Sequence, residues 1–353
     1  MRKLVILGGG YGGLAIIQGL LDDHLPEDIE MVLVDRMPFK GLKTEYYALA
    51  AGTATDLELR VPFPKHPQLM ITYGEVSSID LEGKKVMMEQ SDEIIYDDLV
   101  IALGCTDRYH GIEGAEQFTC SIQSFSNTRK TYQQLNDVKP YGQVNIIGGG
   151  LSGVELAAEL RESRSDLNIS ILDRHDHVLS AFPSKLSLYV EDWFQSHNVN
   201  THHHVSVDRI ENGAIYNGSE IITSDATVWT AGIQPVRIVQ DLQVPKDSGG
   251  RIILNSYSQI AEHPEVYVIG DCASLPLAPS AQAAGAQAEQ VAKVMHALWR
   301  GETPKLQPFH LKGTLGALGK KAGFGLMGKT SVMGRVPRLL KSGVLWKSKR
   351  HSG

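Results

Sequence analysis

Cysteine is scarce in this chain: its 353 residues include only Cys105, Cys120 and Cys272, and no two of them form a Cys-x-x-Cys pair. This usage argues against a cysteine-ligated metal cluster and is typical of a reducing compartment. The adjacent histidines 202–204 do not supply the missing ligands, because neighbouring side chains on a strand point to opposite faces. We therefore expect no metal site.

Long hydrophobic runs are also absent. No stretch of about 18 apolar residues occurs, which excludes an ordinary membrane-spanning helix. The first predicted strand begins at Arg2, which leaves no room for a signal peptide ahead of it. We expect a cytoplasmic protein, and the apolar fraction of 42% can supply the cores of two or three domains.

Acidic residues are missing from the end of the chain. None follows Glu302, while residues 303–353 contain 11 of the 34 Lys and Arg residues. The other 23 basic residues stand against all 40 acidic ones, so residues 1–302 have a formal charge of −17. A basic tail on an acidic body predicts contact with an anionic partner, either a membrane surface or a nucleic acid.

Apolar residues lie among the basic ones in this tail, at positions 339, 340 and 344–346, which suits a membrane interface. No aromatic platform accompanies the charge, so we expect no nucleic-acid partner. We predict a peripheral contact with the cytoplasmic membrane face. The many glycines of the tail, among them Gly343, argue against a long amphipathic helix, and a flexible solvated end is the alternative.

Glycine, in contrast, is abundant and follows a repeated pattern. The pattern G-x-G-x-x-G occurs twice, at Gly8, Gly10 and Gly13 and at Gly148, Gly150 and Gly153. Each copy follows a short apolar run typical of a buried parallel strand, and each opens a predicted helix. The glycines permit a tight turn and close backbone approach, and the N-terminus of the helix favours a pyrophosphate.

An acid follows each copy at the end of the next predicted strand. Asp35 lies 22 residues after Gly13, and Asp173 lies 20 residues after Gly153. At this spacing a carboxylate can bind a ribose 2′-hydroxyl. Two complete units predict two dinucleotides on one chain, with electron transfer between them. Asp173 would repel a 2′-phosphate, which favours NADH over NADPH, although the neighbouring Arg174 could turn towards a phosphate.

The order of the motifs predicts an α/β fold with two Rossmann-like dinucleotide-binding domains, the second inserted in the first. The simplest arrangement joins residues 1–108 to residues 240–302 and places residues 109–239 between them. Residues 303–353 remain as a short basic C-terminal region.

These motifs resemble those of the flavin-dependent pyridine-nucleotide oxidoreductases, and within them most closely the type II NADH dehydrogenases, single-chain NADH:quinone oxidoreductases of the membrane surface. The resemblance covers nearly the whole chain to about residue 302. It rests on GGGYGG, DRMPFKGLKTEYY, VIALG, GGGLSGVELAAEL, WTAGIQP, VYVIGDCA and SAQAAGAQA. It implies FAD on the first glycine pattern, NADH on the second, and a quinone or another small electron acceptor.

The resemblance also implies cofactor contacts outside the glycine patterns. Asp35 would bind the FAD ribose, and Asp271, after Gly270, would bind the ribityl chain. The other implied contacts are Lys43 and Thr44 near the flavin, the backbone of Val76 at the adenine, Gly104 near the adenine half of FAD, and Gly232 in the turn that ends the second unit.

Two residues are expected to be catalytic. Glu155 follows the second glycine pattern, where a carboxylate is often only a partner of the helix dipole; in the family it faces the nicotinamide and the flavin. Gln282 belongs to a family motif of the form Ala-Gln-x-Ala-x-Gln-x-Gly that borders the flavin and quinone pocket. Ala281, Gln282 and Ala284 match it, but the second glutamine is displaced to Gln287. This departure from the motif weakens the prediction of a quinone substrate more than the prediction of a bound flavin.

Three alternatives stay open. A sulfide:quinone oxidoreductase needs paired cysteines with one late in the chain, whereas no cysteine follows Cys272. A soluble diaphorase needs no membrane. A flavin-binding redox sensor or interaction protein would bind the same cofactors but turn over poorly with any acceptor.

Overall fold

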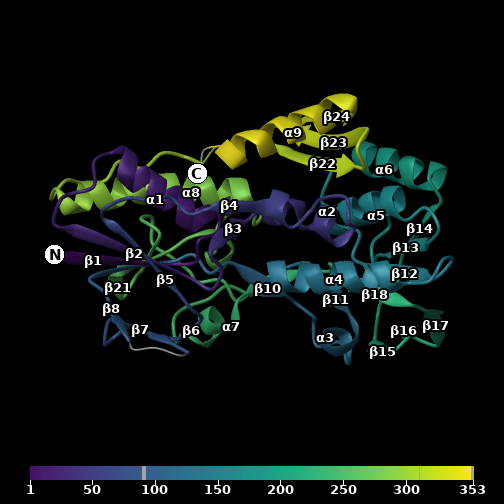
Figure 1. The fold of residues 1–353 in the computed structure, drawn as a ribbon, viewed down its shortest axis with the longest axis horizontal. Coiled ribbons are helices and arrows are strands. Elements are labelled where there is room, and N and C mark those ends of the chain that lie inside the picture. The colour runs from purple at the N-terminus through teal and green to yellow at the C-terminus, as the bar shows by residue number, and fades with distance from the viewer. Residues whose placement is uncertain (90–92, 310, 351–353) are drawn as a thin grey trace.

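The structure of the protein is a computed structural model that describes residues 1–89, 93–309 and 311–350. Two blocks of strands and helices lie side by side, and the C-terminal segment runs across the top of both (Figure 1). Each block contains a mostly or wholly parallel sheet with helices on it. The predicted fold class, α/β with two Rossmann-like units, is confirmed.

The first sheet has six strands in the order β20-β21-β9-β1-β2-β5. All neighbouring strands are parallel except β20 and β21. The strands are β1 (Arg2–Leu7), β2 (Ile29–Asp35), β5 (Leu69–Tyr73), β9 (Asp98–Ile101), β20 (Gln259–Ile260) and β21 (His263–Val268). Two strands from late in the chain therefore complete a sheet that begins at the N-terminus.

Both faces of the first sheet are buried, which explains the continuous apolar run of β1. Leu4 and Ile6 face the cluster under the helices α1 (Tyr11–Asp22) and α8 (Ala281–Trp299), which also pack on each other. Val5 and Leu7 face the opposite cluster. That cluster lies under a small antiparallel sheet and a short helix: β6 (Val76–Asp80), β7 (Lys85–Met88), β8 (Ile94–Ile95) and α7 (Arg237–Asp241).

The second sheet is parallel throughout and has the order β11-β18-β12-β13-β14. Its strands are β11 (Cys120–Ser121), β12 (Gln143–Ile147), β13 (Asn168–Leu172), β14 (Val199–His202) and β18 (Ala226–Trp229). One face packs against α4 (Phe125–Asp137), α5 (Leu151–Ser163) and α6 (Ser184–Ser196). The other packs against α3 (Ala115–Phe118), β15 (Arg209–Glu211), β16 (Ala214–Asn217) and β17 (Glu220–Thr223).

Two short antiparallel strands connect the blocks. The chain leaves the first block through β10 (Cys105–Asp107) and returns through β19 (Ile233–Pro235). The first block also sends α2 (Tyr46–Ala50) across to α4 and α5 of the second. The remaining short elements are β3 (Phe39–Gly41), β4 (Arg60–Pro62) and the 3-10 turns η1 (Lys43–Glu45), η2 (Leu57–Leu59) and η3 (Gly270–Cys272).

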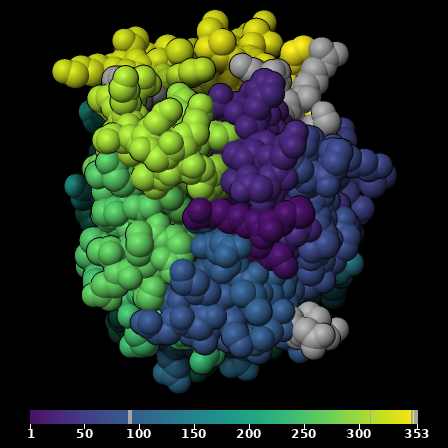
Figure 2. All heavy atoms as spheres, turned by 90° about the vertical axis from the view of Figure 1, so that its left-hand side faces the viewer, coloured from purple at the N-terminus to yellow at the C-terminus, as the bar shows by residue number. Residues whose placement is uncertain are grey.

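The C-terminal region is a folded layer. It consists of an antiparallel sheet and a helix: β22 (Thr314–Leu318), β23 (Ala322–Met327), β24 (Thr330–Gly334) and α9 (Arg335–Arg350). Leu318 and Phe324 are fully buried members of the core that contains α5. Seen from the end of the molecule that carries β1, this layer covers one edge (Figure 2). The alternative of a flexible solvated end is wrong for this region.

The glycines of the tail have a different role from the one expected. Gly316 lies against the ring of Phe324, where an added side chain would overlap the ring carbons. Gly343 lies inside α9 with open space around it. The expectation that glycine would prevent a long helix is wrong, because α9 packs along β22 and β23 and this packing offsets the cost of one glycine, about 1 kcal/mol.

We predict that Phe324→Ala lowers the free energy of unfolding by about 3–5 kcal/mol, because it leaves a cavity in a core shared by the C-terminal sheet and α5. Chemical denaturation measures the loss. Met327→Ala, on the same strand but 42% exposed, is the control and should change stability by less than about 0.5 kcal/mol. Equal stability of wild type and Phe324→Ala would show that the C-terminal layer is only loosely attached.

Candidate functional site

The first glycine pattern forms a cradle between β1 and α1. Gly8 has a φ of +97°, and a Cβ there would lie 2.6 Å from the Ala102 oxygen. A side chain at Gly13 would overlap the Gly8 carbonyl, so this glycine lets the helix pack closely on the strand. Gly10, which caps α1, has no atom within 4 Å of its Cβ position, and no side chain caps the helix.

The second pattern repeats this geometry between β12 and α5. Gly148 has a φ of +107°, and a Cβ there would meet the backbone of Ala231 at 2.8 Å. A side chain at Gly153 would overlap the Gly148 carbonyl, and Gly150 again faces open space at an uncapped helix start. Both cradles therefore fit a dinucleotide pyrophosphate, because an open helix N-terminus accepts a phosphate that only glycine lets come close.

The two acids lie beside their cradles and are held in the same way. Asp35 Oδ2 accepts from the Gly9 N–H at 2.6 Å, and its Oδ1 accepts from the Met37 N–H at 2.7 Å. Asp173 Oδ2 accepts from the Gly149 N–H at 2.6 Å. Burial raises the pKa of Asp35, while its backbone hydrogen bonds with Met37 and Gly9 act in the opposite direction. Each carboxylate is thus fixed beside its glycine loop by hydrogen bonds from backbone N–H groups.

Three polar side chains meet at the end of β9, next to the link between the blocks. Lys43 Nζ donates to Cys105 Sγ at 3.1 Å, and Cys105 Sγ donates to Asp271 Oδ2 at 3.0 Å. Burial raises the pKa of Cys105 to about 12, with opposite contributions from Lys43 and Asp271. Cys105 is therefore a protonated thiol that orients Asp271. Gly104, with a φ of +73°, precedes it and accepts a hydrogen bond from Cys272 Sγ.

The other expected contacts lie apart from this group. Thr44 Oγ1 is 2.9 Å from the hydroxyl of Tyr11 at the start of α1, which places η1 beside the first cradle. Val76 is buried at the start of β6. Gly232 follows β18 with a φ of +134°, and its carbonyl accepts from the Arg108 N–H at 3.1 Å.

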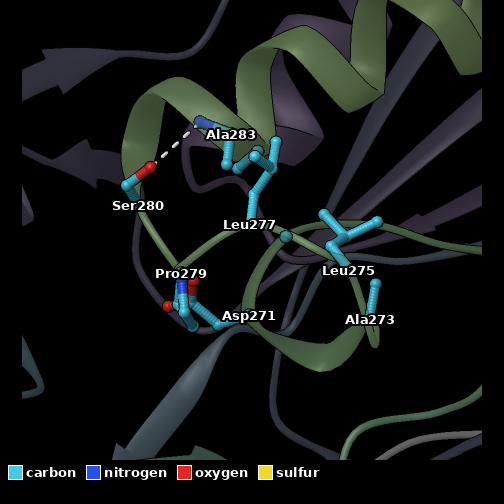
Figure 3. A pocket seen from close by; sticks show the side chains of 9 residues that line it. Asp271, Ala273, Leu275, Leu277, Pro279, Ser280 and Ala283 are labelled. Carbon is cyan, nitrogen blue, oxygen red and sulfur yellow. Dashed lines mark hydrogen bonds between the residues drawn. The ribbon is translucent and has the colours of Figure 1, made fainter. Parts of the chain in front are cut away.

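The start of α8 borders Asp271. A small pocket is lined by η3 and the first turn of α8, including Asp271, Ser280, Ala283 and Ala284 (Figure 3). Gln287 is fully buried; its Oε1 accepts from the Gly270 N–H at 2.8 Å. The displaced glutamine of the family motif thus holds the turn that presents Asp271.

Gln282, expected to be catalytic, faces the C-terminal segment. Its Oε1 accepts from the Lys312 N–H at 2.9 Å. Among the described residues, Gln282 contacts Lys312 whereas Glu155 contacts Ala317 and Lys341, so the two expected catalytic side chains have separate partners and belong to different blocks.

Glu155 is a buried carboxylate with partners from several parts of the chain. It is 4% exposed, forms an ion pair with Lys341 of α9, and accepts from the Ala317 N–H at 2.8 Å. Lys341 Nζ also lies 3.6 Å from Glu45 Oε1, and Tyr47 donates its hydroxyl proton to Glu45 Oε2 at 3.0 Å. Glu45 and Tyr47 come from the first block, so Glu155 lies where the two blocks and the C-terminal layer meet.

Burial raises the pKa of Glu155 to about 7, although Lys341 and the Ala317 N–H act in the opposite direction. The sequence did not predict that Lys341 and Glu45 belong to the surroundings of Glu155. No local pattern marks Lys341 among the basic residues of the tail, and it reaches Glu155 only through a contact across 186 residues.

The sequence pattern of the pyridine nucleotide-disulphide oxidoreductase family matches residues 2–288. The chain belongs to this family. Membership confirms the prediction of an FAD-dependent oxidoreductase that uses a pyridine nucleotide, and it agrees with the two cradles described above.

Named relatives of this oxidoreductase narrow the comparison. The NADH dehydrogenase-like protein YutJ of Bacillus subtilis is 52% identical over 355 residues, which cover 100% of both chains. A type II NADH:quinone oxidoreductase of Staphylococcus epidermidis is 24% identical over 96% of this chain and 93% of its own. These relatives confirm the predicted resemblance to the type II NADH dehydrogenases.

Solved structures share the fold of this oxidoreductase. NDH2 from Plasmodium falciparum in complex with NADH has a TM-score of 0.86 at 15% identity and covers 99% of this chain and 96% of that chain. The sulfide:quinone oxidoreductase from Aquifex aeolicus has a TM-score of 0.85 at 19% identity and covers 100% and 92%. Identity this low shows the fold and does not distinguish the electron acceptors.

We predict that Gly10→Ala retains the fold but loses much of its FAD, because its methyl group enters the open space of the cradle and meets no protein atom. Gly13→Ala should lose both FAD and stability, since its methyl group overlaps the Gly8 carbonyl. Flavin absorbance per folded protein and thermal unfolding separate the two effects. A fully loaded, folded Gly10→Ala protein would count against the FAD assignment.

Proposed function

We propose that the protein is an NADH dehydrogenase that transfers two electrons from NADH through FAD to a quinone-type acceptor at a membrane surface. The observation that carries the proposal is the position of Glu155. It lies directly after the second cradle and pairs with Lys341 of the tail, which also pairs with Glu45 of the first block.

The two cradles have separate partners in this proposal. The loop of Gly8, Gly10 and Gly13 and the carboxylate of Asp35 would hold FAD, with Asp271 on its ribityl chain. The loop of Gly148, Gly150 and Gly153 with Asp173 would hold NADH. When bound, FAD supplies the hydride and electron chemistry, and the protein supplies position, electrostatics and exclusion of water.

Glu155 would hold the proton that the reaction needs. Reduction of a quinone by NADH consumes one proton besides the hydride. Glu155 and Glu45 share the single ammonium group of Lys341, so this buried group is neutral only when one carboxyl carries a proton. Because the pKa of Glu155 is raised to about 7 by burial, its carboxyl can take up and release a proton near neutral pH.

The helix α9 would bring the oxidoreductase to the membrane. Three of its apolar side chains are exposed: Val336 is 61%, Leu339 is 70% and Val344 is 64% exposed. The sequence of α9 also contains basic residues, and each that reaches an anionic surface contributes about 1 kcal/mol. Within the described ranges, no helix has the length and apolarity to cross a bilayer, so this contact would be peripheral.

A sulfide-oxidising function has less support. All three cysteines are buried free thiols, and burial raises the pKa of Cys105 to about 12 and that of Cys120 to about 11. Thiols that remain protonated are poor nucleophiles. The relevant rivals are therefore a soluble diaphorase and a redox sensor.

Stopped-flow reduction of the FAD-loaded protein by NADH, followed by reoxidation with a menaquinone analogue, ferricyanide and oxygen in parallel, tests the proposal. Fast reoxidation by the quinone supports it. Fast reoxidation by ferricyanide alone favours a diaphorase, and slow turnover with every acceptor favours a sensor.

Glu155→Gln should lower quinone reduction at least about ten-fold and flatten its pH dependence around neutrality. The stability effect has a definite sign. Folded Glu155 binds its proton more tightly than the unfolded chain, so the wild type loses stability as the pH rises from about 4.5 to about 7. In Glu155→Gln the free energy of unfolding should not show this decline with rising pH. Chemical denaturation of both proteins at several pH values measures the difference.

Glu162→Gln is the matched control for this prediction. Glu162 is an exposed residue of the same helix and also accepts a backbone hydrogen bond from the C-terminal layer, from Lys320 at 2.9 Å. If Glu162→Gln and Glu155→Gln have the same pH dependence as the wild type, the proton assignment to Glu155 is wrong.

Leu339→Glu combined with Val344→Glu should weaken binding to anionic vesicles at low salt more than ten-fold, because each replaced side chain contributes about 1.5–3 kcal/mol when buried in a bilayer. Quinone reduction on vesicles should fall while ferricyanide reduction stays unchanged. Ile221→Glu, which alters a 59% exposed apolar residue on β17, should leave both unchanged. Point variants are needed because removal of residues 303–353 would also strip β22 and β23 from α5.

The membrane assignment fails if the wild-type protein does not bind anionic vesicles at low salt. It also fails if the double variant binds them as tightly as the wild type does. Flavin content of each variant is measured first, so that loss of FAD is not mistaken for loss of membrane contact.

A further inference from the structure

One buried cation beside the first cradle takes no part in the contacts described above. Lys40 is the middle residue of β3 and is only 5% exposed. Its ammonium lies over the ring of Tyr11, with Nζ 4.3 Å from the ring centroid. Among residues 1–89, 93–309 and 311–350, no carboxylate forms an ion pair with this Nζ and no acceptor forms a hydrogen bond with it. Lysines are almost never fully buried without such a partner.

The position of this ammonium is unfavourable for the protein alone. Tyr11 is the first residue of α1 and follows Gly10, whose Cβ position has no atom within 4 Å. The tyrosine hydroxyl lies 2.9 Å from Thr44 Oγ1, which holds the ring at this end of the helix. A cation at a helix N-terminus faces the positive end of the helix dipole, and burial without a counter-charge adds a further cost. An anion at the start of α1 would offset both costs.

The acids in the segments around β3 have other partners. Asp35 accepts two backbone N–H groups, Asp56 pairs with two arginines, and Glu45 faces Lys341. The ionisable groups of these segments are Tyr11, Asp35, Arg36, Lys43, Glu45, Tyr46, Asp56 and Arg60. Burial lowers the pKa of Lys40 to about 8, because no opposing charge stabilises its ammonium. This cation is therefore free to pair with an anionic ligand.

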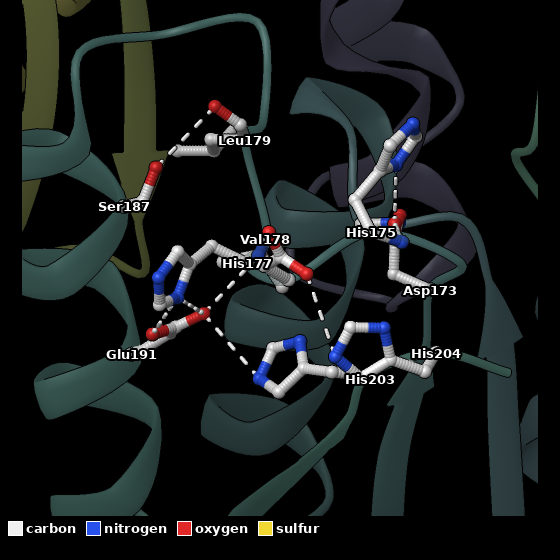
Figure 4. A network of polar contacts seen from close by, with 11 residues as sticks. Asp173, His175, His177, Val178, Leu179, Ser187, Glu191, His203 and His204 are labelled. Atoms are coloured by element: carbon white, nitrogen blue, oxygen red, sulfur yellow. Dashed lines mark hydrogen bonds and ion pairs between the residues drawn. The ribbon is translucent and has the colours of Figure 1, made fainter.

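The second cradle has a different residue at the corresponding place in the sequence. Lys40 is five residues after Asp35, and the residue five positions after Asp173 is Val178. Val178 is fully buried and lies on the loop that follows Asp173 (Figure 4). The arginine directly after this acid, Arg174, is exposed. At this place the first cradle thus has a buried ammonium where the second has an apolar side chain.

We propose that Lys40 binds the pyrophosphate of FAD and makes the first cradle a site that keeps its dinucleotide. The two phosphates are the anionic groups of FAD, and the glycine loop already directs a pyrophosphate to the start of α1. A hydrogen bond between an ammonium and a phosphate is about twice as strong as a neutral one. The second cradle, with Val178 at this place, can release its nucleotide in each turnover. The inference rests on the proposed function only in taking the first cradle as the FAD site.

Release of FAD from the full-length, FAD-loaded protein tests the proposal. The dissociation constant is measured from the fluorescence of free FAD in a dilution series, after circular dichroism has shown that each variant is folded. Lys40→Met keeps the length of the side chain but removes its charge. Its dissociation constant should rise about ten-fold to one hundred-fold, the effect of losing one hydrogen bond to a charged group. Lys65→Met, which alters an exposed lysine after β4, is the control and should hold FAD as the wild type does.

The pH dependence of release separates the charge of Lys40 from its shape. Because the pKa of Lys40 is about 8 when no phosphate faces it, the site must take up a proton to bind FAD above this pH. The wild-type dissociation constant should therefore rise about ten-fold between about pH 7 and about pH 9. Lys40→Arg stays charged and should retain FAD without this rise. Lys40→Met should bind FAD weakly at both pH values.

Two kinds of failure can be told apart. If Lys40→Met holds FAD as tightly as the wild type while Gly10→Ala loses it, the role of Lys40 is wrong and the cradle assignment stands. The role of its charge is also wrong if Lys40→Arg shows the same rise with pH as the wild type. If the purified wild type holds no FAD, or Gly10→Ala holds it as tightly, the first cradle is not the FAD site and the proposed function fails with it.

Discussion

Glu155 lies on α5 where water hardly reaches it, and a charge in such a place requires a partner. Lys341 supplies the partner from the last helix of the chain. To deliver this lysine, β22–β24 must cover α5 and α9 must run back over the first block. The same ammonium group also draws Glu45 of the first block into the cluster. The position of the C-terminal layer is therefore tied to this one carboxylate, and the layer adds to the contact between the blocks that α2 makes with α4 and α5.

The cradles could be predicted from the sequence because each is built locally. The strand, the glycines, the helix and the acid follow one another within about 30 residues, and their roles are imposed by the turn itself. Gly8 and Gly148 have positive φ, and Gly10 and Gly150 face open space, as their spacing requires. Because the motifs are local, their order along the chain was enough to predict the parallel sheets. It also predicted that one unit is inserted between strands of the other.

The residues that the sequence did not reveal act at long range or through neighbours. Lys341 resembles the other basic residues of the tail, and only the packing of α9 shows that it is buried. Gln287 looked like a misplaced copy of a motif glutamine, yet its hydrogen bond to Gly270 fixes the turn before Asp271. The role of the tail glycines was predicted wrongly for a related reason. Helix propensity describes an isolated helix, whereas Gly316 is set by its contact with the ring of Phe324 on the neighbouring strand.

The late position of Lys341 has a consequence for biosynthesis. A chain folds as it is made, with its N-terminal parts first, so both nucleotide cradles and α5 exist before α9 has left the ribosome. Until these late residues have been made and have folded, Glu155 has neither its lysine nor the N–H of Ala317, and the carboxylate faces water or takes a proton. A product of premature termination would carry two complete cradles and an uncovered junction between them. The cover of Glu155 is therefore a late event in folding, because it needs Ala317 and Lys341, which are made after both cradles.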